Sequence, residues 1–205
     1  MANLVPKVPA ETWLATAQQV LVEEGIDAVK VDRLAQRLGV TRGGFYHHFN
    51  DRADLLSRLL ALWSGTALFV PPGLSLRSPA EALQAIDGVV EHLIREDSYD
   101  PHFDLAVREW ARSDASVAAA VAGMDAERIA ALYKIFLALG CNKQEADIRA
   151  RVFYFHQIGY YAIGIAEPDS GRRERARVYL EILCGEANLA RARSHAVEEK
   201  HRAPA

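Results

Sequence analysis

The spacing of apolar residues is the feature that most constrains the fold of this chain. Apolar residues recur at intervals of three and four along most of the sequence, and runs of alternating β-branched residues are nearly absent. Such a period places apolar side chains on one face of an α-helix, whereas a half-buried strand needs a period of two. Because 50% of the residues are hydrophobic, these helices can bury a sizeable core. We therefore predict an all-α protein.

Glycines, prolines and capping residues set the expected helix boundaries. Gly25 and Gly39 can end helices in a left-handed conformation, and Thr41 and Asp51 can cap the helices that follow them. Pro71-Pro72-Gly73 is expected to end the helix that connects two domains. Helices are predicted at residues 10–24, 31–38, 42–48, 52–69, 79–95, 101–113, 116–139, 143–165 and 172–189.

A short segment rich in glycine, aromatic and imidazole groups follows the second helix. It reads Gly39-Val40-Thr41-Arg42-Gly43-Gly44-Phe45-Tyr46-His47-His48-Phe49. Phe45 and Phe49 lie four residues apart, so they can pin a short helix to a core and turn its other face to solvent. Two glycines destabilise a helix by about 1 kcal/mol each relative to alanine. A recognition helix that enters the major groove of DNA explains that cost, so the spacing predicts a helix-turn-helix.

Net charge does not decide whether the chain binds DNA. The formal charge is -3, and residues 1–52 contain as many acidic as basic side chains. Phosphate binding therefore requires that the cations of this segment gather on one face. Arg42 can reach a guanine or a phosphate, the two glycines allow close backbone approach, and Tyr46 and the histidines can donate to phosphate oxygens.

Residues 25–56 resemble the DNA-binding domain of the TetR family of regulators. The resemblance rests on Leu34-Ala35, Gly39-Val40, Thr41-Arg42-Gly43, the block from Phe45 to Phe49, and Arg52 with Leu55-Leu56. It implies that Phe45 and Phe49 pack inward and that Arg52 touches phosphate. It also implies DNA contacts from Thr41, Arg42, Gly43, Gly44, Tyr46, His47 and His48.

Two residues depart from the family pattern. Lys30 stands where many members have a hydroxyl, and it could supply a cationic phosphate contact instead. Asp32 stands where an arginine is frequent, and phosphates would repel it unless it accepts from a cytosine amine or from an arginine. Arg33 and Arg37 are expected only to solvate a helix face.

The remainder of the chain is expected to pair two copies and to sense a small molecule. We predict a DNA-binding domain at residues 1–52, a helical effector-binding and dimerisation domain at 53–190, and a disordered tail at 191–205. A DNA reader with two-fold symmetry needs a dimer, and the family resemblance implies that the last two long helices form it. Candidate interface residues are Phe153, Ile158, Tyr161, Ile165, Val178, Tyr179, Ile182 and Leu183.

Aromatic side chains in the C-terminal part could line a ligand cavity. Aromatic residues at helical spacing are core residues more often than pocket residues, so the set indicates only that a largely apolar cavity is possible. The effector itself is not identified by the sequence. The candidates are Trp63, His92, Phe103, Trp110, Tyr133, Phe136, Tyr154, His156 and Tyr160.

Two rival interpretations lead to different functions. An enzyme is not expected, because the chain lacks a nucleophile elbow, a His-x-x-x-His pair and a phosphate loop. A constitutive or architectural DNA-binding dimer would keep the helix-turn-helix and lack a ligand cavity.

We further expect no cofactor, no metal, reduced Cys141 and Cys184, and a cytoplasmic protein that does not bind membranes. The predicted function is a transcription regulator, most simply a repressor. It would bind a palindromic operator as a homodimer and be released by a small-molecule effector.

Overall fold

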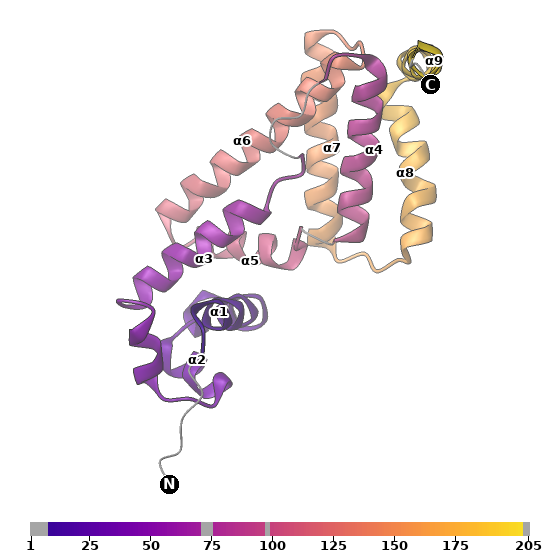
Figure 1. Cartoon of the computed structure of the whole chain (residues 1–205). Helices are drawn as coiled ribbons and strands as arrows, with labels where there is room; N and C mark the ends of the chain where they lie inside the picture. The colour runs from indigo at the N-terminus through magenta and orange to yellow at the C-terminus, as the bar shows by residue number, and fades with distance from the viewer. Residues whose placement is uncertain (1–7, 71–75, 97–98, 203–205) are drawn as a thin grey trace. The chain divides into compact units, whose positions relative to one another are not determined.

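The computed structural model describes residues 8–70, 76–96 and 99–202, and every regular element within them is helical (Figure 1). The all-α prediction is therefore confirmed. The chain divides into two compact units. Unit 1 contains residues 1–67 and 100–122, and unit 2 contains residues 68–99 and 123–205. The predicted boundary at residue 52 thus differs from the observed division, because unit 1 also includes a segment from the middle of the chain.

Unit 1 begins with the predicted helix-turn-helix. Its elements are α1 (Ala10–Glu24), the 3₁₀ turn η1 (Ile26–Ala28), α2 (Val31–Leu38), the 3₁₀ helix η2 (Arg42–His47), α3 (Arg52–Thr66), α5 (Pro101–Ala111) and the start of α6. Gly39 ends α2 at a φ of 65°, and the Asp51 side chain caps α3 by accepting from the backbone N–H of Asp54. Both boundary signals act as the sequence predicts. The Pro71–Gly73 signal lies outside the described residues.

A buried carboxylate joins α3 to α5 inside unit 1. Asp104 is 1% exposed. It accepts from the indole Nε1–H of Trp63 at 2.9 Å and from Nε of Arg108 at 3.0 Å. Gln18 on α1 donates to Asp100, the residue that caps α5. These bonds explain why residues 100–122 group with α1 and α3 in unit 1.

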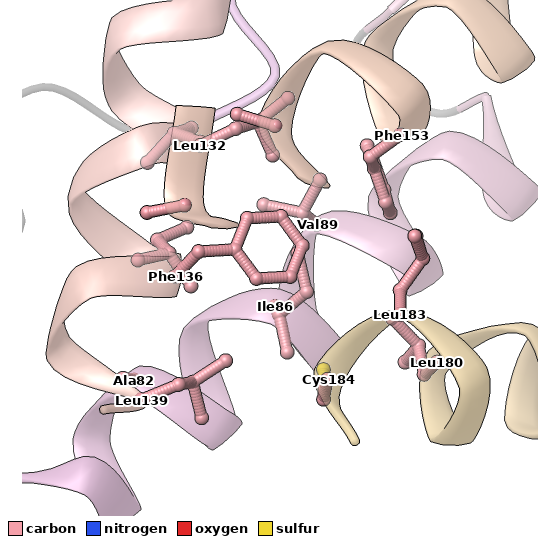
Figure 2. Close-up of a cluster of buried hydrophobic side chains, with 14 of the residues drawn as sticks. Ala82, Ile86, Val89, Leu132, Phe136, Leu139, Phe153, Leu180, Leu183 and Cys184 are labelled. Atoms are coloured by element: carbon pink, nitrogen blue, oxygen red, sulfur yellow. The ribbon is translucent and has the colours of Figure 1, made fainter. Parts of the chain in front are cut away.

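Unit 2 is a helical bundle around one apolar core. It contains α4 (Pro79–Arg95), most of α6 (Ala115–Ala138), α7 (Lys143–Ile163), α8 (Asp169–Cys184) and α9 (Glu186–Arg202). Helices α4 and α8 lie side by side (Figure 1). Phe136 is fully buried, and Figure 2 shows its ring beside Ile86 and Val89 of α4. Phe136 is therefore a core residue, which corrects its assignment to a ligand pocket.

A buried cation distinguishes this core from a purely apolar one. Arg128 on α6 is only 1% exposed. Its guanidinium carbon lies 4.5 Å from the ring centre of Phe69 and 5.5 Å from that of Tyr99, and Nη1 lies 3.5 Å from the Tyr154 hydroxyl. Tyr154 in turn donates to Asp125 at 2.5 Å. Aromatic faces and a hydroxyl are thus among the groups that stabilise this buried charge.

The C-terminal end of the chain differs from the sequence prediction. Gly185 adopts a φ of 80° and ends α8, so the single helix predicted at residues 172–189 is two helices. The tail predicted to be disordered from residue 191 is helical as far as Arg202. Leu189 and Ala192 are buried in the core of unit 2, and α9 packs against α4. Burial of these two side chains stabilises α9 by tertiary packing. The mostly polar composition of this segment did not indicate that packing.

We expect Asp104→Ala to lower the free energy of unfolding by about 3 kcal/mol, because it leaves the Trp63 indole and the Arg108 cation without their buried acceptor. Chemical denaturation of both variants measures the effect. Asp147→Ala is the matched control, because Asp147 forms the same i,i+4 pair with Arg151 on an exposed surface. It should change stability by less than about 0.5 kcal/mol. Equal effects of the two substitutions would contradict a special role for Asp104.

Candidate nucleic-acid interface and ligand cavity

Three aromatic side chains anchor η2 to unit 1. Phe45 and Trp13 are fully buried, and Phe49 is 2% exposed. The rings of Trp13 and Phe45 meet edge to face at 5.5 Å, and those of Phe45 and Phe49 stack at 4.9 Å. The predicted inward packing of Phe45 and Phe49 is confirmed. One face of η2 is thereby fixed, and the other is left to solvent.

The outward face of η2 carries most of the predicted DNA contacts. Tyr46 is 60% exposed. Thr41, Arg42, Gly43 and His47 are also exposed, and so is Lys30, which precedes α2. The sequence predicts a short helix at residues 42–48 capped by Thr41, whereas η2 is a 3₁₀ helix from Arg42 to His47 without a side-chain cap from Thr41. Its two glycines favour this short and weakly helical form.

The packing of unit 1 does not require either glycine of η2. Neither Gly43 nor Gly44 has a positive φ. A Cβ atom on Gly44 would lie 3.6 Å from Trp13, and one on Gly43 would lie 3.7 Å from Thr41, which are ordinary van der Waals distances. Alanine would therefore fit at both positions and would favour the helix. The absence of side chains here suits the close approach of a partner's backbone.

Arg42 and Asp32 form an ion pair between η2 and α2. Nε of Arg42 lies 3.1 Å from Oδ1 of Asp32, and the two side chains are 67% and 74% exposed. The acidic side chain that departs from the family pattern is thus paired with an arginine. Pairing with an arginine is one of the two arrangements expected for an acid at this position.

Two residues predicted to contact DNA have hydrogen-bond partners inside unit 1. Arg52 donates from Nε to the carbonyl of Val29 at 2.6 Å and from Nη2 to that of Ile26 at 2.9 Å. Nε2 of His48 lies 2.8 Å from the carbonyl of Val8. Because a carbonyl only accepts, Nε2 carries the proton, and a neutral His48 then has no N–H at Nδ1 to offer a phosphate. Sequence reasoning missed these roles because their partners are backbone atoms.

Arg33 and Arg37 join α2 to the end of α1. Arg33 donates to Glu24 at 2.9 Å, and Arg37 pairs with Glu23 and Glu24. The hydrogen bond from Arg33 contributes most to holding the pKa of Glu24 below its ordinary value. These two cations are therefore occupied within unit 1.

A cavity of about 880 Å³ opens in unit 2, and its walls come from α4, α7, α8 and the α7–α8 connection. Apolar side chains, among them Val90, Leu93 and Ile94, form much of its surface. His156 and Tyr179 stack with ring centres 4.4 Å apart. Burial lowers the pKa of His156 and raises that of Tyr179 to about 12. An imidazole and a phenol that favour their neutral forms thus line a mainly apolar cavity.

Three of the four charged residues that line this cavity have partners within the chain. Arg172 donates to Glu96 at 2.9 Å and lies over the ring of Tyr160 at 4.7 Å. Glu167 pairs with Arg175 and accepts from the Tyr160 hydroxyl at 3.0 Å. The opposite charges in the wall therefore compensate one another.

Only two of the nine aromatic candidates, His156 and Tyr160, line this cavity. Trp63, Phe103 and Trp110 are buried in unit 1, and Phe136 and Tyr154 belong to the core of unit 2. His92 and Tyr133 are half-buried and are not among the lining residues. The pocket prediction did not include the lining residues of α8. Apolar residues at helical spacing on α8 are compatible with a dimer interface and with a cavity wall, so the sequence could not distinguish the two.

Comparison with known proteins assigns the N-terminal segment. Residues 14–59 match the family of bacterial regulatory proteins described as the tetR family. The match is confined to this segment, which contains the helix-turn-helix. Within the TetR-type domain, the chain is 40% identical over 45 residues to the HTH-type transcriptional regulator SrpR of Pseudomonas putida, covering 22% of this chain and 21% of that protein. It is 36% identical over 50 residues to the HTH-type transcriptional repressor BepR of Brucella suis, covering 24% of each.

Solved structures extend the likeness beyond the TetR-type domain at the level of fold. A transcriptional regulator from Rhodococcus sp. Rha1 matches with a TM-score of 0.64 and 20% identity, over 90% of this chain and 98% of that chain. The fatty acid degradation regulator FadR from Bacillus halodurans matches with a TM-score of 0.59 and 16% identity, over 88% and 96% of the two chains. By contrast, the chain matches only about a quarter of the length of the curated relatives.

Two further searches of the described residues gave negative results. No helix within them is long and apolar enough to cross a membrane. No group of three or more His, Cys, Asp or Glu side chains in the same residues could hold a metal ion.

We expect Arg52→Ala to lower the free energy of unfolding by about 2 kcal/mol, because two carbonyls lose a charged donor. Thermal or chemical denaturation measures this change, with Arg151→Ala as a control for loss of an exposed ion pair. If Arg52 contacts phosphate, Arg52→Ala should leave stability unchanged and should make the salt dependence of DNA affinity shallower. That second pattern would restore the role that the sequence assigns to Arg52.

Proposed function

We propose that this protein is a repressor that binds a palindromic operator as a homodimer and is released by a small-molecule effector. The observation that carries the proposal is the η2 surface. Buried Phe45 holds this short helix in place, and Arg42, Gly43, Tyr46 and His47 are exposed on its other face. A cation, a bare backbone and hydrogen-bonding groups on one face suit entry into a major groove.

The lack of net positive charge shapes how this surface would bind. Arg33, Arg37 and Arg52 are engaged within unit 1, so Lys30 and Arg42 supply the exposed cations beside η2. Few phosphates would be neutralised by each subunit, and the salt dependence of binding should be modest. Affinity would then depend on base contacts and on the simultaneous binding of two subunits.

An apolar surface on α7 and α8 supports a dimer. Ile148, Val152 and Phe155 recur at i, i+4 and i+7 along α7 and are 56%, 45% and 58% exposed. Val178 and Ile182 lie one turn apart on α8 and are 55% and 74% exposed. Large apolar side chains in such rows mark an interaction surface more often than a solvent-facing one. Two copies paired there would present two recognition helices to one operator.

Two of the interface candidates have another role. Phe153 is fully buried and Leu183 is 8% exposed, and both belong to the core of unit 2. We therefore remove them from the proposed dimer surface. Ile158, Tyr161 and Tyr179 are partly buried against the same core. Ile165, Val178 and Ile182 remain as exposed candidates, although they also line the cavity of unit 2, and Ile148, Val152 and Phe155 join them.

The cavity in unit 2 supports effector binding. Its volume of about 880 Å³ falls in the usual range for sites that take small organic molecules, and apolar walls with a few convergent polar groups are typical of such sites. Because the wall cations Arg172 and Arg175 already have partners, an anion bound there would lose water without gaining an unpaired counter-charge. Glu174, the remaining charged lining residue, is exposed to solvent. We propose an uncharged, largely apolar effector.

Repression and release would follow if effector binding and operator binding are thermodynamically linked. A dimer bound at a promoter blocks polymerase, and an effector lowers operator affinity only as far as it prefers the form that binds DNA poorly. Screening uncharged aromatic and aliphatic compounds for release of bound operator tests this part. If none of these compounds releases bound operator, the alternative function of a constitutive DNA-binding dimer is favoured.

The first experiment is selection of DNA fragments by the purified protein from a random pool. We expect enrichment of a palindrome with half-site centres about 34–36 Å apart. Arg42→Ala should weaken binding of that sequence by about 1–3 kcal/mol and relax base preference at one position of each half-site. Binding that is weak, strongly salt-sensitive and indifferent to sequence would contradict operator recognition.

The dimer surface is tested by Ile148→Lys, because Ile148 does not line the cavity. We expect sedimentation velocity to show a monomer, because a charge placed in a paired apolar surface is costly to desolvate. Thermal unfolding should remain cooperative, since Ile148 is mostly exposed in the single chain. Val197→Lys on α9 also adds a charge at an exposed apolar position and should leave the dimer intact. Dissociation by Val197→Lys alone would move the interface to α9.

A further inference from the structure

Asp32 is an unexpected residue on a surface that would face DNA. It is the second residue of α2, and its side chain is 74% exposed. A carboxylate near phosphates is repelled by them, so this position lowers general DNA affinity. Its neighbour across the turn is Arg42, the first residue of η2, which lies within ion-pair distance.

Folding stability does not account for the pair of Asp32 and Arg42. Both side chains are more than two-thirds exposed, and ion pairs with such exposure contribute little to stability. The pairs that join α1 to α2 differ in this respect, because the side chains of Glu24 and Arg37 are 29% and 25% exposed. A different explanation is therefore needed for an acid at position 32.

The geometry of the pair suggests that explanation. The contact involves Nε of Arg42, whereas the two terminal nitrogens of a guanidinium form the edge that can donate in parallel to O6 and N7 of guanine. An arginine side chain has several rotatable bonds, and a carboxylate at Nε restricts them before DNA arrives. Binding a guanine would then require less ordering of the side chain.

We propose that Asp32 is a positioning residue that orients Arg42 toward a guanine and so sets the base preference at one position of each half-site. This inference rests on the proposed operator binding and deepens it. Asp32 increases discrimination in two ways. It holds Arg42 in a base-reading orientation, and its charge disfavours binding in which Arg42 contacts only phosphate.

The test uses the operator selected by the full-length protein. The guanine read by Arg42 is the position at which Arg42→Ala loses preference. Affinities are then measured for the operator and for a copy with that base pair changed. We expect Asp32→Ala and Asp32→Asn to reduce discrimination at this position up to about fivefold, the upper limit for an exposed ion pair, and to raise affinity for unrelated DNA. Asp32→Glu keeps a carboxylate and should retain part of the discrimination.

Two controls separate positioning from charge and from folding. Glu109→Ala changes the net charge by the same amount in the same unit, at a side chain that is 77% exposed. It should leave discrimination unchanged. Melting temperatures of the Asp32 variants should match that of the parent. In an Arg42→Ala background, Asp32→Ala should have no further effect on discrimination, because the residue through which it acts is gone.

Three results would overturn the inference. Discrimination within twofold of the parent in Asp32→Ala, with a large loss in Arg42→Ala, would leave operator recognition standing without a role for Asp32. An equal loss at every operator position would show a general effect on docking. A parent protein that selects no sequence would remove both the inference and the proposed function.

Discussion

The packing of Phe45 against Trp13 is the contact on which the surface proposed to face DNA depends. The segment from Arg42 to His47 has two glycines, no side-chain cap and only a 3₁₀ hydrogen-bond pattern, so it has little stability of its own. Burial of one aromatic ring against another supplies a fixed position instead. The exposed groups of η2 then keep defined positions although the helix that carries them is short. The inward face of η2 therefore anchors the helix, and the outward face remains available to contact another molecule.

The charged residues of unit 1 also divide into those that stabilise the fold and those that are exposed to solvent. Glu23, Glu24, Arg33 and Arg37 form a network that joins α1 to α2, and Arg52 bonds the turn around η1 to the start of α3. These charges stabilise the scaffold, which explains how a segment with no net charge can still present Arg42 and Lys30 to solvent. Counting charges along the sequence could not reveal this, because the count does not say which cations are engaged.

Local signals in the sequence predicted most of the helices. Gly39 and Asp51 act at single positions, through a left-handed φ and a side-chain acceptor, so their effect can be read without the tertiary structure. Gly185 is the same kind of signal, and it was missed because the apolar residues on both sides of it suggest one continuous helix. The roles of Arg52 and His48 were not predictable, because their partners are carbonyls brought near by folding. The cavity was equally hidden, since its walls come from separate helices.

The position of α9 has a consequence for how the protein is made. Leu189 and Ala192, close to the end of the chain, fill the core of unit 2 beside α4, which is synthesised about a hundred residues earlier. All residues of unit 1 precede residue 123, so its packing can begin while the rest is still being translated. Unit 2 must wait for α9 to leave the ribosome. During that interval the part of α4 that packs against α9 is uncovered, and it is there that a nascent chain would need protection from aggregation.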